Sequence, residues 1–367
     1  MDPTLKRRLK YEKLQSEWYS LRPILGFANW ALIYILLGGR EAGKSYAVTD
    51  YFVNSFVKRG IPFTWIRLTE RQANKLLQNN AEKLVDPDIR RRYCLDLITS
   101  GNNVYSVKRR ERIVHHKDGT EETKFEIVEK VLMARVYALS TFYADKGSIF
   151  DKDFLSDPRM EYHVAVDEFE REKGEKNTFD IVYALVNQLE NLLRSTKERT
   201  KIFFMGNTLE EASDLLCSFN FIPEKFGRYK LKKKRAVIEY IEPSEAYLKR
   251  RKGTIADILM PDASTFTNKI DTDKTLITKK RTVNPSKIIK FTKSKDTWFT
   301  VWDGNIVKKY HGEKKTVIAM RPYLDEIYNV DLMKNMVSLF NSRSLLFSNL
   351  ITFKSFQKEM ELLIPQR

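Results

Sequence analysis

Apolar residues follow two different patterns along the first 210 residues, and the two patterns alternate. Short, continuous apolar runs are typical of buried strands in a parallel sheet. Such runs cover residues 31–37, 63–66, 164–166 and 202–205. Before and between them, apolar residues return at the three- and four-residue spacing of a helix, over residues 5–21, 46–56, 70–84 and 179–193. Alternating strands and helices predict an α/β fold, a parallel sheet with helices on both faces.

Residues 104–139 interrupt this alternation with a β pattern. Two strand-like segments, residues 112–116 and 123–127, flank Lys117-Asp118-Gly119-Thr120, which is a strong hairpin signal. Beyond about residue 210 the elements become shorter. We predict strands there at residues 287–291, 297–302 and 316–319, and one or two helices from about residue 323. The second part of the chain is therefore expected to be a smaller α+β domain.

A chain of 367 residues exceeds what one ordinary core holds, so two domains are expected. The boundary is predicted at a basic run within residues 230–235, which Pro243 follows. We place a first domain at residues 1–228, a basic linker at residues 229–247 and a second domain at residues 248–367.

Cysteine content and the distribution of apolar residues exclude several classes of protein. The two cysteines, Cys94 and Cys217, are far apart, which excludes a disulfide scaffold and a cysteine-rich metal site. The N-terminus is charged and lacks the apolar core of a signal peptide. The longest apolar stretch, residues 24–37, is too short to span a bilayer. We therefore expect a protein of a reducing cytoplasm with no membrane partner.

Positive charge is concentrated in one segment of the chain. The whole sequence has a formal net charge of +17. Residues 246–321 alone contain 18 basic and 7 acidic residues, a net charge of +11. This concentration favours a polyanionic partner that is bound mainly by the second half of the chain. A basic surface without a binding role is the alternative.

A complete phosphate-loop motif, G-x-x-x-x-G-K-[ST], stands between a predicted strand and a predicted helix. Its residues are Gly38, Gly39, Arg40, Glu41, Ala42, Gly43, Lys44 and Ser45. Glycines let backbone N–H groups turn toward phosphates, and the helix N-terminus adds a favourable potential for an anion. We expect Lys44 to reach the β- and γ-phosphates of a nucleoside triphosphate and the Ser45 hydroxyl to bind Mg²⁺.

An acidic pair follows the apolar run at residues 164–166. Asp167 is predicted to hold the Mg²⁺, and Glu168 to activate the attacking water. A base that activates water favours ATP hydrolysis over the phosphate transfer of a small-molecule kinase. Asn207, after the next apolar run, is a candidate for sensing the γ-phosphate or positioning the water, with a simple turn residue as the alternative.

A basic loop connects the helix predicted at residues 179–193 with the strand at residues 202–205. In ring ATPases, a basic residue at this place can reach the site of the neighbouring subunit and neutralise developing charge. Arg194, Lys197 and Arg199 are the candidates, and a solvated loop would carry such charges as well.

At these residues the chain resembles the genome-packaging motor ATPases of small, short-tailed phages with protein-primed genomes, the Picovirinae type of terminase-like ATPase. The likeness extends over roughly residues 30–210. It includes Arg40, Tyr46 and Ala47 around the phosphate loop, and the acidic pair with the Phe169 that follows it. It also includes the strand at residues 63–67, whose final basic residue responds to nucleotide in the family and corresponds to Arg67.

The resemblance assigns trans-acting roles as well. The family's trans-acting arginine falls on Arg194, with Arg199 as the alternative because this loop is one residue longer here. Lys146 is the candidate for a second trans-acting residue. The Ser-Asn pair of the family corresponds to Gly206-Asn207.

The resemblance implies an ATP- and Mg²⁺-dependent motor that translocates double-stranded DNA into a preformed procapsid. It implies an ASCE (additional-strand) P-loop domain and a C-terminal RNase H-like domain that grips DNA without nuclease chemistry. The assembly implied is a homo-oligomeric, pentameric ring at the portal vertex, in the cytoplasm of the infected host. Some relatives use a structural packaging RNA, and the sequence leaves open whether this chain does. The alternatives are another nucleic-acid translocase or helicase, and a P-loop kinase or nucleotide switch.

Overall fold

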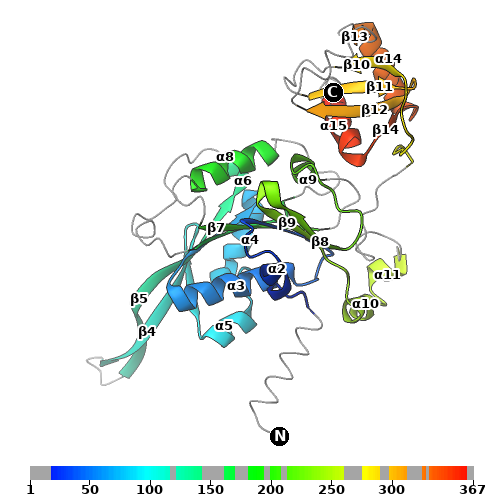
Figure 1. Cartoon of the computed structure of the whole chain (residues 1–367). Helices are drawn as coiled ribbons and strands as arrows, with labels where there is room; N and C mark the ends of the chain where they lie inside the picture. The colour runs from blue at the N-terminus through cyan, green and yellow to red at the C-terminus, as the bar shows by residue number, and fades with distance from the viewer. Residues whose placement is uncertain are drawn as a thin grey trace. The chain divides into compact units, whose positions relative to one another are not determined.

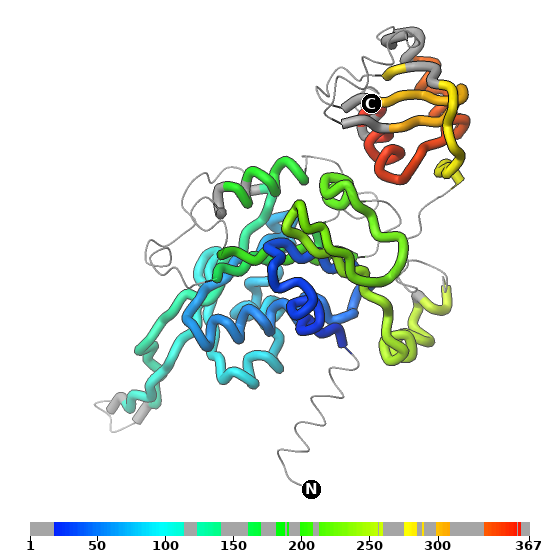
Figure 2. The backbone as a smooth tube through the Cα atoms, in the orientation of Figure 1, coloured from blue at the N-terminus to red at the C-terminus, as the bar shows by residue number. Residues whose placement is uncertain are grey.

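The structure is a computed structural model that places the chain in two compact units (Figures 1 and 2). It describes residues 18–115, 121–142, 161–169, 181–193, 199–207, 213–259, 275–289, 297–311, 325–327 and 330–361. Unit 1 contains the described residues up to 207 and those from 223 to 259. Unit 2 contains the described residues 213–222 and those from 275 onward.

A nine-stranded sheet forms the centre of unit 1, in the order β3-β4-β5-β2-β6-β7-β1-β9-β8. The six middle strands are parallel: β5 (Glu121–Ala138), β2 (Phe63–Arg67), β6 (Tyr162–Asp167), β7 (Thr200–Asn207), β1 (Ile33–Gly38) and β9 (Ala236–Tyr240). Antiparallel strands close both edges: β3 (Asp96–Ser100) and β4 (Asn103–His115) on one side, β8 (Gly227–Leu231) on the other. Because β7 lies between β1 and β6, the sheet has the additional-strand order that the resemblance implies.

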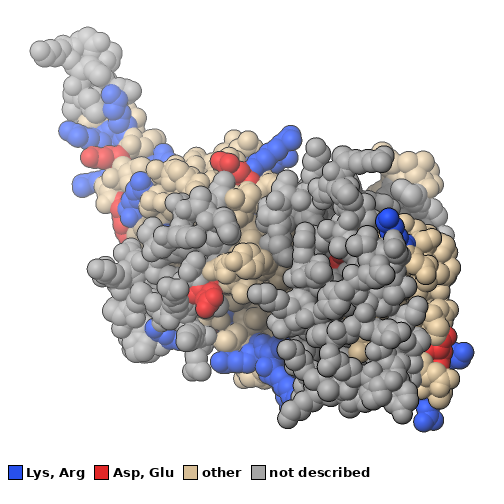
Figure 3. Space-filling model, turned by 90° about the horizontal axis from the view of Figure 1, so that it is seen from above, with Lys and Arg blue, Asp and Glu red and all other residues tan. Residues whose placement is uncertain are grey.

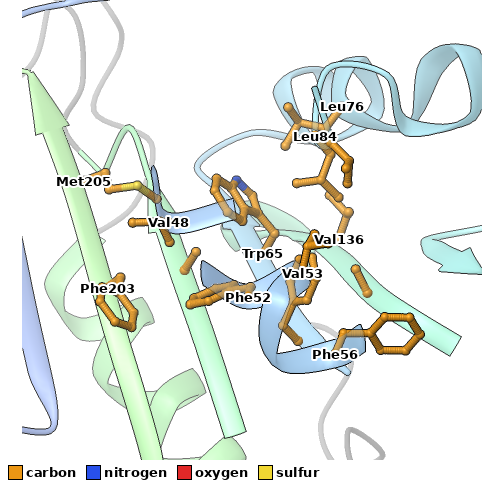
Figure 4. Packing of buried hydrophobic residues seen from close by; sticks show 14 of the residues in the cluster. Val48, Phe52, Val53, Phe56, Trp65, Leu76, Leu84, Val136, Phe203 and Met205 are labelled. Atoms are coloured by element: carbon orange, nitrogen blue, oxygen red, sulfur yellow. The ribbon is translucent and has the colours of Figure 1, made fainter. Parts of the chain in front are cut away.

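Helices cover both faces of this sheet, as the sequence predicts (Figure 1). One face carries α2 (Arg22–Phe27), α3 (Lys44–Arg59), α4 (Glu70–Ala81) and α5 (Pro87–Tyr93), whose apolar residues share one core cluster with the strands. In this cluster, Phe52 of α3 packs against Phe63, Trp65 and Phe203 of the sheet (Figure 4). Helix α8 (Ile181–Leu193), with buried Ala184 and Leu185, lies on the other face, and α6 (Leu139–Phe142) contacts it.

The predicted hairpin is present and is longer than expected. Strands β4 and β5 pair from Asn103 opposite Arg135 to His115 opposite Glu121. We call residues 108–115 and 121–130 the arm, because here the two strands pair only with each other. The predicted turn at residues 117–120 lies outside the described residues.

The prediction of a basic linker at residues 229–247 is wrong. These residues form most of β8, the one-turn 3-10 helix η1 (Lys232–Lys234), β9 and the start of α10 (Glu245–Arg251). Strand β9 is buried throughout and pairs with β1, so it belongs to the core of unit 1. The basic run occupies the turn of an edge hairpin, where lysines remain solvated. The predicted domain boundary is therefore also wrong, because unit 1 continues through α11 (Ile255–Leu259).

Unit 2 combines a small sheet of its own with helices. Its sheet has the order β13-β10-β11-β12-β14. The elements are β10 (Pro285–Ile289), β11 (Thr297–Trp302), β12 (Ile306–His311), β13 (Asp325–Ile327), β14 (Leu346–Phe347), α9 (Asp214–Ser218), α14 (Val330–Asn341) and α15 (Leu350–Glu361). Phe299, Phe347 and Phe356 form the centre of its core. The likeness to an RNase H-like fold stays a prediction.

Two further predictions fall largely outside the described residues. The strand expected at residues 316–319 lies outside them, and so does the helix expected at residues 5–21 except for its last four residues, which are not helical. Within the described part of the chain, no helix is long and apolar enough to cross a membrane.

Candidate nucleotide-binding site

The phosphate loop connects the end of β1 with the start of α3. Two of its residues have left-handed backbone angles, Glu41 with φ of 63° and Gly43 with φ of 91°. A Cβ atom at Gly43 would lie 3.1 Å from the Trp18 ring, so both the backbone angle and the space favour glycine. The loop thus turns sharply into the N-terminus of a 16-residue helix, where the helix dipole attracts an anion.

Lys44 is buried with its ammonium group inside the curve of this loop. Its Nζ donates hydrogen bonds to the carbonyl oxygens of Gly38 and Gly39, each at 2.8 Å. Only 7% of the residue is exposed. The positive charge is therefore held at the place that the helix N-terminus also makes favourable for phosphate.

Ser45 and Asp167 bring two hard oxygen ligands together. The Ser45 hydroxyl lies 3.2 Å from both carboxylate oxygens of Asp167, which ends β6 and is 3% exposed. Burial raises the pKa of Asp167, and Glu168 adds to this effect, whereas Arg67 and Lys44 oppose it. Mg²⁺ in proteins is bound by one or two carboxylates together with phosphate oxygens and water, and this pair fits that pattern. Within the described chain, no group of three or more His, Cys, Asp or Glu residues could hold a metal.

Glu168 is held in an unusual backbone conformation beside this pair. Its φ is 54°, and its N–H donates to the carbonyl of Met205 at 2.9 Å. A glutamate in the left-handed region costs on the order of 1–3 kcal/mol and is common at functional sites. The carboxylate is 46% exposed and contacts Arg67 at 2.5 Å, and Arg67 also contacts Asp167 at 2.8 Å. Arg67 at the end of β2 thus fixes both carboxylates.

These residues surround a cavity of about 470 Å³ at the carboxyl ends of the parallel strands. Its lining includes the predicted site residues Arg40, Glu41, Ala42, Gly43, Lys44, Ser45, Asp167, Glu168 and Asn207. Asn207 ends β7 opposite Gly38 of β1. Among the predicted nucleotide-binding residues, Gly38, Gly39 and Arg67 lie outside the lining; they hold Lys44 or the acidic pair instead.

Sequence reasoning missed a group of residues that fixes the outer turn of the loop. The Tyr247 hydroxyl donates to the carbonyl of Arg40 at 2.9 Å, and Arg250 donates to the carbonyl of Glu41 at 2.8 Å. The Arg250 guanidinium also lies 3.8 Å from the centre of the Trp18 ring. Arg250 lies within the segment that the sequence predicts to bind a polyanion. No local pattern could have found these contacts, because about 210 residues separate the two sides.

A second cavity, of about 650 Å³, adjoins the first and shares Trp18 and Ala42 with it. Its walls combine aromatic rings with polar residues, and the rings besides Trp18 are Tyr19, Phe27, Phe226, Tyr240 and Tyr247. A buried carboxylate, Glu239, accepts hydrogen bonds from the Tyr19 hydroxyl at 2.6 Å and from Arg228 at 2.7 Å. Burial and this carboxylate raise the pKa of Tyr19.

Of the three residues predicted to act in trans, Arg199 is the one within the described part of the chain, and it lies away from this site. Arg199 stands just before β7, where its carbonyl accepts from the N–H of Tyr162 at the start of β6. It lies at the amino ends of the strands, roughly 26 Å along β7 from the phosphate loop of its own chain. Arg194 and Lys146 lie outside the described residues.

Comparison with known proteins agrees with the resemblance seen in the sequence. No protein-family model matches the chain. The DNA packaging proteins of Bacillus phages PZA and phi29 are each 22% identical to it over 219 residues, which is 59% of this chain and 54% of each relative. The match thus spans only about half of their length.

Two solved structures show the same fold. The Phi-28 DNA packaging motor aligns with a TM-score of 0.62 at 14% identity, covering 96% of this chain and 99% of that one. The bacteriophage phi29 genome packaging motor assembly aligns with a TM-score of 0.58 at 20% identity, covering 93% and 99%. The predicted resemblance and the α/β P-loop fold are confirmed.

Proposed function

We propose that this protein is an ATP-hydrolysing motor that moves double-stranded DNA into a phage procapsid. The observation that carries the proposal is the joint placement of Lys44, Ser45, Asp167 and Glu168 around one cavity. The fold shared with packaging motors supports DNA translocation as the work that hydrolysis drives.

The reaction begins with the triphosphate bound along the phosphate loop. Loop N–H groups and Lys44 bind the β- and γ-phosphate oxygens. Ser45 and Asp167 would hold Mg²⁺, which would neutralise charge on the transferring phosphoryl group. The adjoining aromatic cavity receives the adenine base, which stacks on rings such as Trp18.

Glu168 then accepts a proton from the attacking water. Its carboxylate is half exposed and reaches the cavity, whereas Asp167 beside it is buried. Arg67 positions both side chains and couples the base to the end of β2. Asn207, at the end of β7, contacts the γ-phosphate or orients the water.

Other parts of the proposed motor act between molecules. Arg194, Arg199 or Lys146 completes the site of a neighbouring subunit within a pentameric ring. The ring docks on the portal of the procapsid in the host cytoplasm, and a structural RNA is a further partner to test. Lys279, Lys280 and Arg281, all exposed just before β10, are proposed to contact DNA phosphates.

The test measures phosphate release from ATP by the full-length protein, with and without linear duplex DNA, across a series of salt concentrations. We expect DNA to stimulate hydrolysis and its affinity to fall steeply with salt. Replacing Lys279, Lys280 and Arg281 by Glu should reduce the salt dependence by roughly one unit of slope per lost phosphate contact.

The matched control replaces Lys232 and Lys233, which are exposed in the edge hairpin of unit 1, and should keep the salt dependence of the wild type. Transfer of phosphate to a small molecule, or hydrolysis that DNA does not change, would contradict the proposal. Separation of the strands of a forked duplex would favour a helicase, and uptake of DNA by procapsids would identify the packaging motor.

A further inference from the structure

The arm leaves the body of unit 1 as a two-stranded ribbon, and no third strand of the described chain pairs with it (Figure 2). Its base is fixed by the ion pair between Arg109 and Asp96 of β3, at 2.7 Å. Isolated two-stranded ribbons are marginally stable in water, so a ribbon of this length is normally supported by a partner.

The two faces of the arm differ in chemistry. Residues that pair across antiparallel strands share a face. One face carries Ile113, Phe125 and Ile127, which are 56%, 61% and 44% exposed, with Glu111 opposite Phe125 and, at the base, Arg109 opposite Ile127. The other face carries charged residues, with Arg110 opposite Glu126 and Arg112 opposite Lys124. The arm therefore presents an apolar stripe that no described residue covers.

The charge of the arm disfavours DNA as its partner. Residues 108–130 contain seven basic and six acidic residues, although the chain as a whole carries a net charge of +17. Basic and acidic side chains are both visible on the arm, which projects at the upper left of Figure 3. A nearly neutral ribbon with an apolar face fits a protein surface better than a polyanion.

A complementary apolar surface lies at the opposite edge of the same sheet. We call Leu248, Ile255, Ile258 and Leu259 the far-edge patch; they are 36%, 75%, 70% and 71% exposed. They belong to α10 and α11, which follow β9, whereas the arm belongs to the strands of the other edge (Figure 1). One chain cannot bring its own two opposite edges together, but two copies can.

Charges beside the two surfaces also complement each other. Glu111 on the apolar face has no cation partner among the described residues. Lys249 and Lys252, both exposed, lie beside the far-edge patch. An apolar contact bordered by opposite charges specifies one orientation of the two molecules.

We propose that the apolar face of the arm binds the far-edge patch of a second copy of this chain. Because the two surfaces differ, the contact is head-to-tail, and head-to-tail contacts that close produce rings. Only the expectation of closure rests on the proposed motor function; the pairwise contact stands on the geometry alone.

This contact reaches the phosphate loop of the second copy through one helix. Leu248 of the patch is the immediate neighbour of Tyr247, which binds the carbonyl of Arg40. Arg250, two residues further along α10, binds the carbonyl of Glu41. The arm of one subunit thus contacts the helix that holds the phosphate loop of the next.

The first experiment measures self-association of the full-length protein by sedimentation velocity over a concentration series, without nucleotide or DNA. Phe125→Ser should weaken association at least about tenfold, the loss expected for one buried phenylalanine. Glu126→Ser, on the charged face, is the matched control and should associate like the wild type. The unfolding temperature should be equal for all three proteins, because the arm lies outside the core.

The second experiment identifies the surface that the arm contacts. In a Cys94→Ser background, which removes the exposed native thiol, one preparation carries Phe125→Cys and another carries Ile258→Cys. Under mild oxidation, their mixture should form a disulfide-linked dimer, and neither preparation alone should do so.

A monomeric wild type, normal association of Phe125→Ser, or no disulfide in the mixture would overturn the proposal. A dimer from Phe125→Cys alone would also overturn it, because arms would then pair with arms. The salt and DNA experiments test ATP hydrolysis separately, so failure of this contact is distinguishable from failure of the proposed function.

Discussion

The carboxyl edge of the sheet and the arm both carry many charges, but the two regions hold them in opposite ways. At the sheet edge, Lys44 and Asp167 are buried, the Arg67 side chain is only 14% exposed, and each contacts fixed partners within the chain. On the arm, Lys108 and Glu129 form an ion pair at 2.5 Å while both remain largely exposed. Buried charges must be paired to be stable, whereas exposed pairs contribute little. The sheet edge is therefore preorganised for chemistry, and the arm is available for contact.

The largest expected difference between the two regions concerns turnover. Lys44→Ala removes the charge that faces the phosphates and should lower ATP hydrolysis by about 10³-fold or more. Lys124→Ala on the charged face of the arm should leave hydrolysis unchanged. Phosphate release by the two variants checks this, and equal activities would show that the cavity at the sheet edge is not the active site.

Mutations in the two regions should also differ in how much they lower the free energy of unfolding. Arg67→Ala leaves the buried Asp167 carboxylate without its nearest cation and should destabilise unit 1 by about 3 kcal/mol. Arg112→Ala removes an arginine that is 70% exposed and 3.9 Å from Glu126, so its effect should stay below about 0.5 kcal/mol. Denaturant unfolding measures both. A small effect of Arg67→Ala would mean that Asp167 does not depend on this ion pair.

A smaller effect tests the connection between α10 and the phosphate loop. Tyr247→Phe removes one hydrogen bond to the carbonyl of Arg40 and keeps the ring. We expect ATP affinity to fall about fivefold, which corresponds to roughly 1 kcal/mol for one hydrogen bond. Tyr183→Phe, at an exposed position of α8, is the control. Unchanged ATP binding by Tyr247→Phe would show that α10 does not support the nucleotide-binding site.

The smallest effect concerns pH. His163 of β6 is 2% exposed, stacks on Phe52 at 5.0 Å, and lies 3.8 Å from Glu161. Burial lowers the pKa of His163, while Glu161 opposes this shift. Below about pH 6.5 the unfolded chain therefore takes up a proton that the folded chain does not, and stability should fall by up to about 1 kcal/mol per pH unit.

His163→Phe should remove this slope between about pH 7 and 5.5. The pKa of Glu161 is lowered to about 2, so Glu161 titrates below that window. Thermal unfolding of both proteins at the two pH values checks the prediction. An equal slope in His163→Phe would assign the pH dependence to other groups.

The sequence predicts the structure of the sheet edge better than that of the arm. The phosphate loop and the pair Asp167-Glu168 were predictable because each is a contiguous motif after an apolar run. The hairpin was predictable from its turn, but its apolar face was not recognised. The contact of Tyr247 with the loop could not be predicted, because it joins residues far apart in the chain.

The errors have physical causes as well. A run of lysines after residue 229 suggested a linker, although Ala236–Tyr240 is an apolar strand that extends the sheet. Lysines tolerate the turn of an edge hairpin as readily as a linker, so charge alone could not distinguish them. The short helix at Asp214–Ser218 belongs to unit 2 although it follows β7 directly, and this too depends on long-range packing.

The proposed mechanism depends on Glu168 activating the water that attacks ATP. The most direct measurement compares equilibrium binding of ATP with the rate of phosphate release in Glu168→Gln and in the wild type. Glutamine preserves the size of the side chain but cannot accept the proton. The account predicts unchanged ATP binding and release slowed by about 10²–10⁴-fold. Release at the wild-type rate would contradict it.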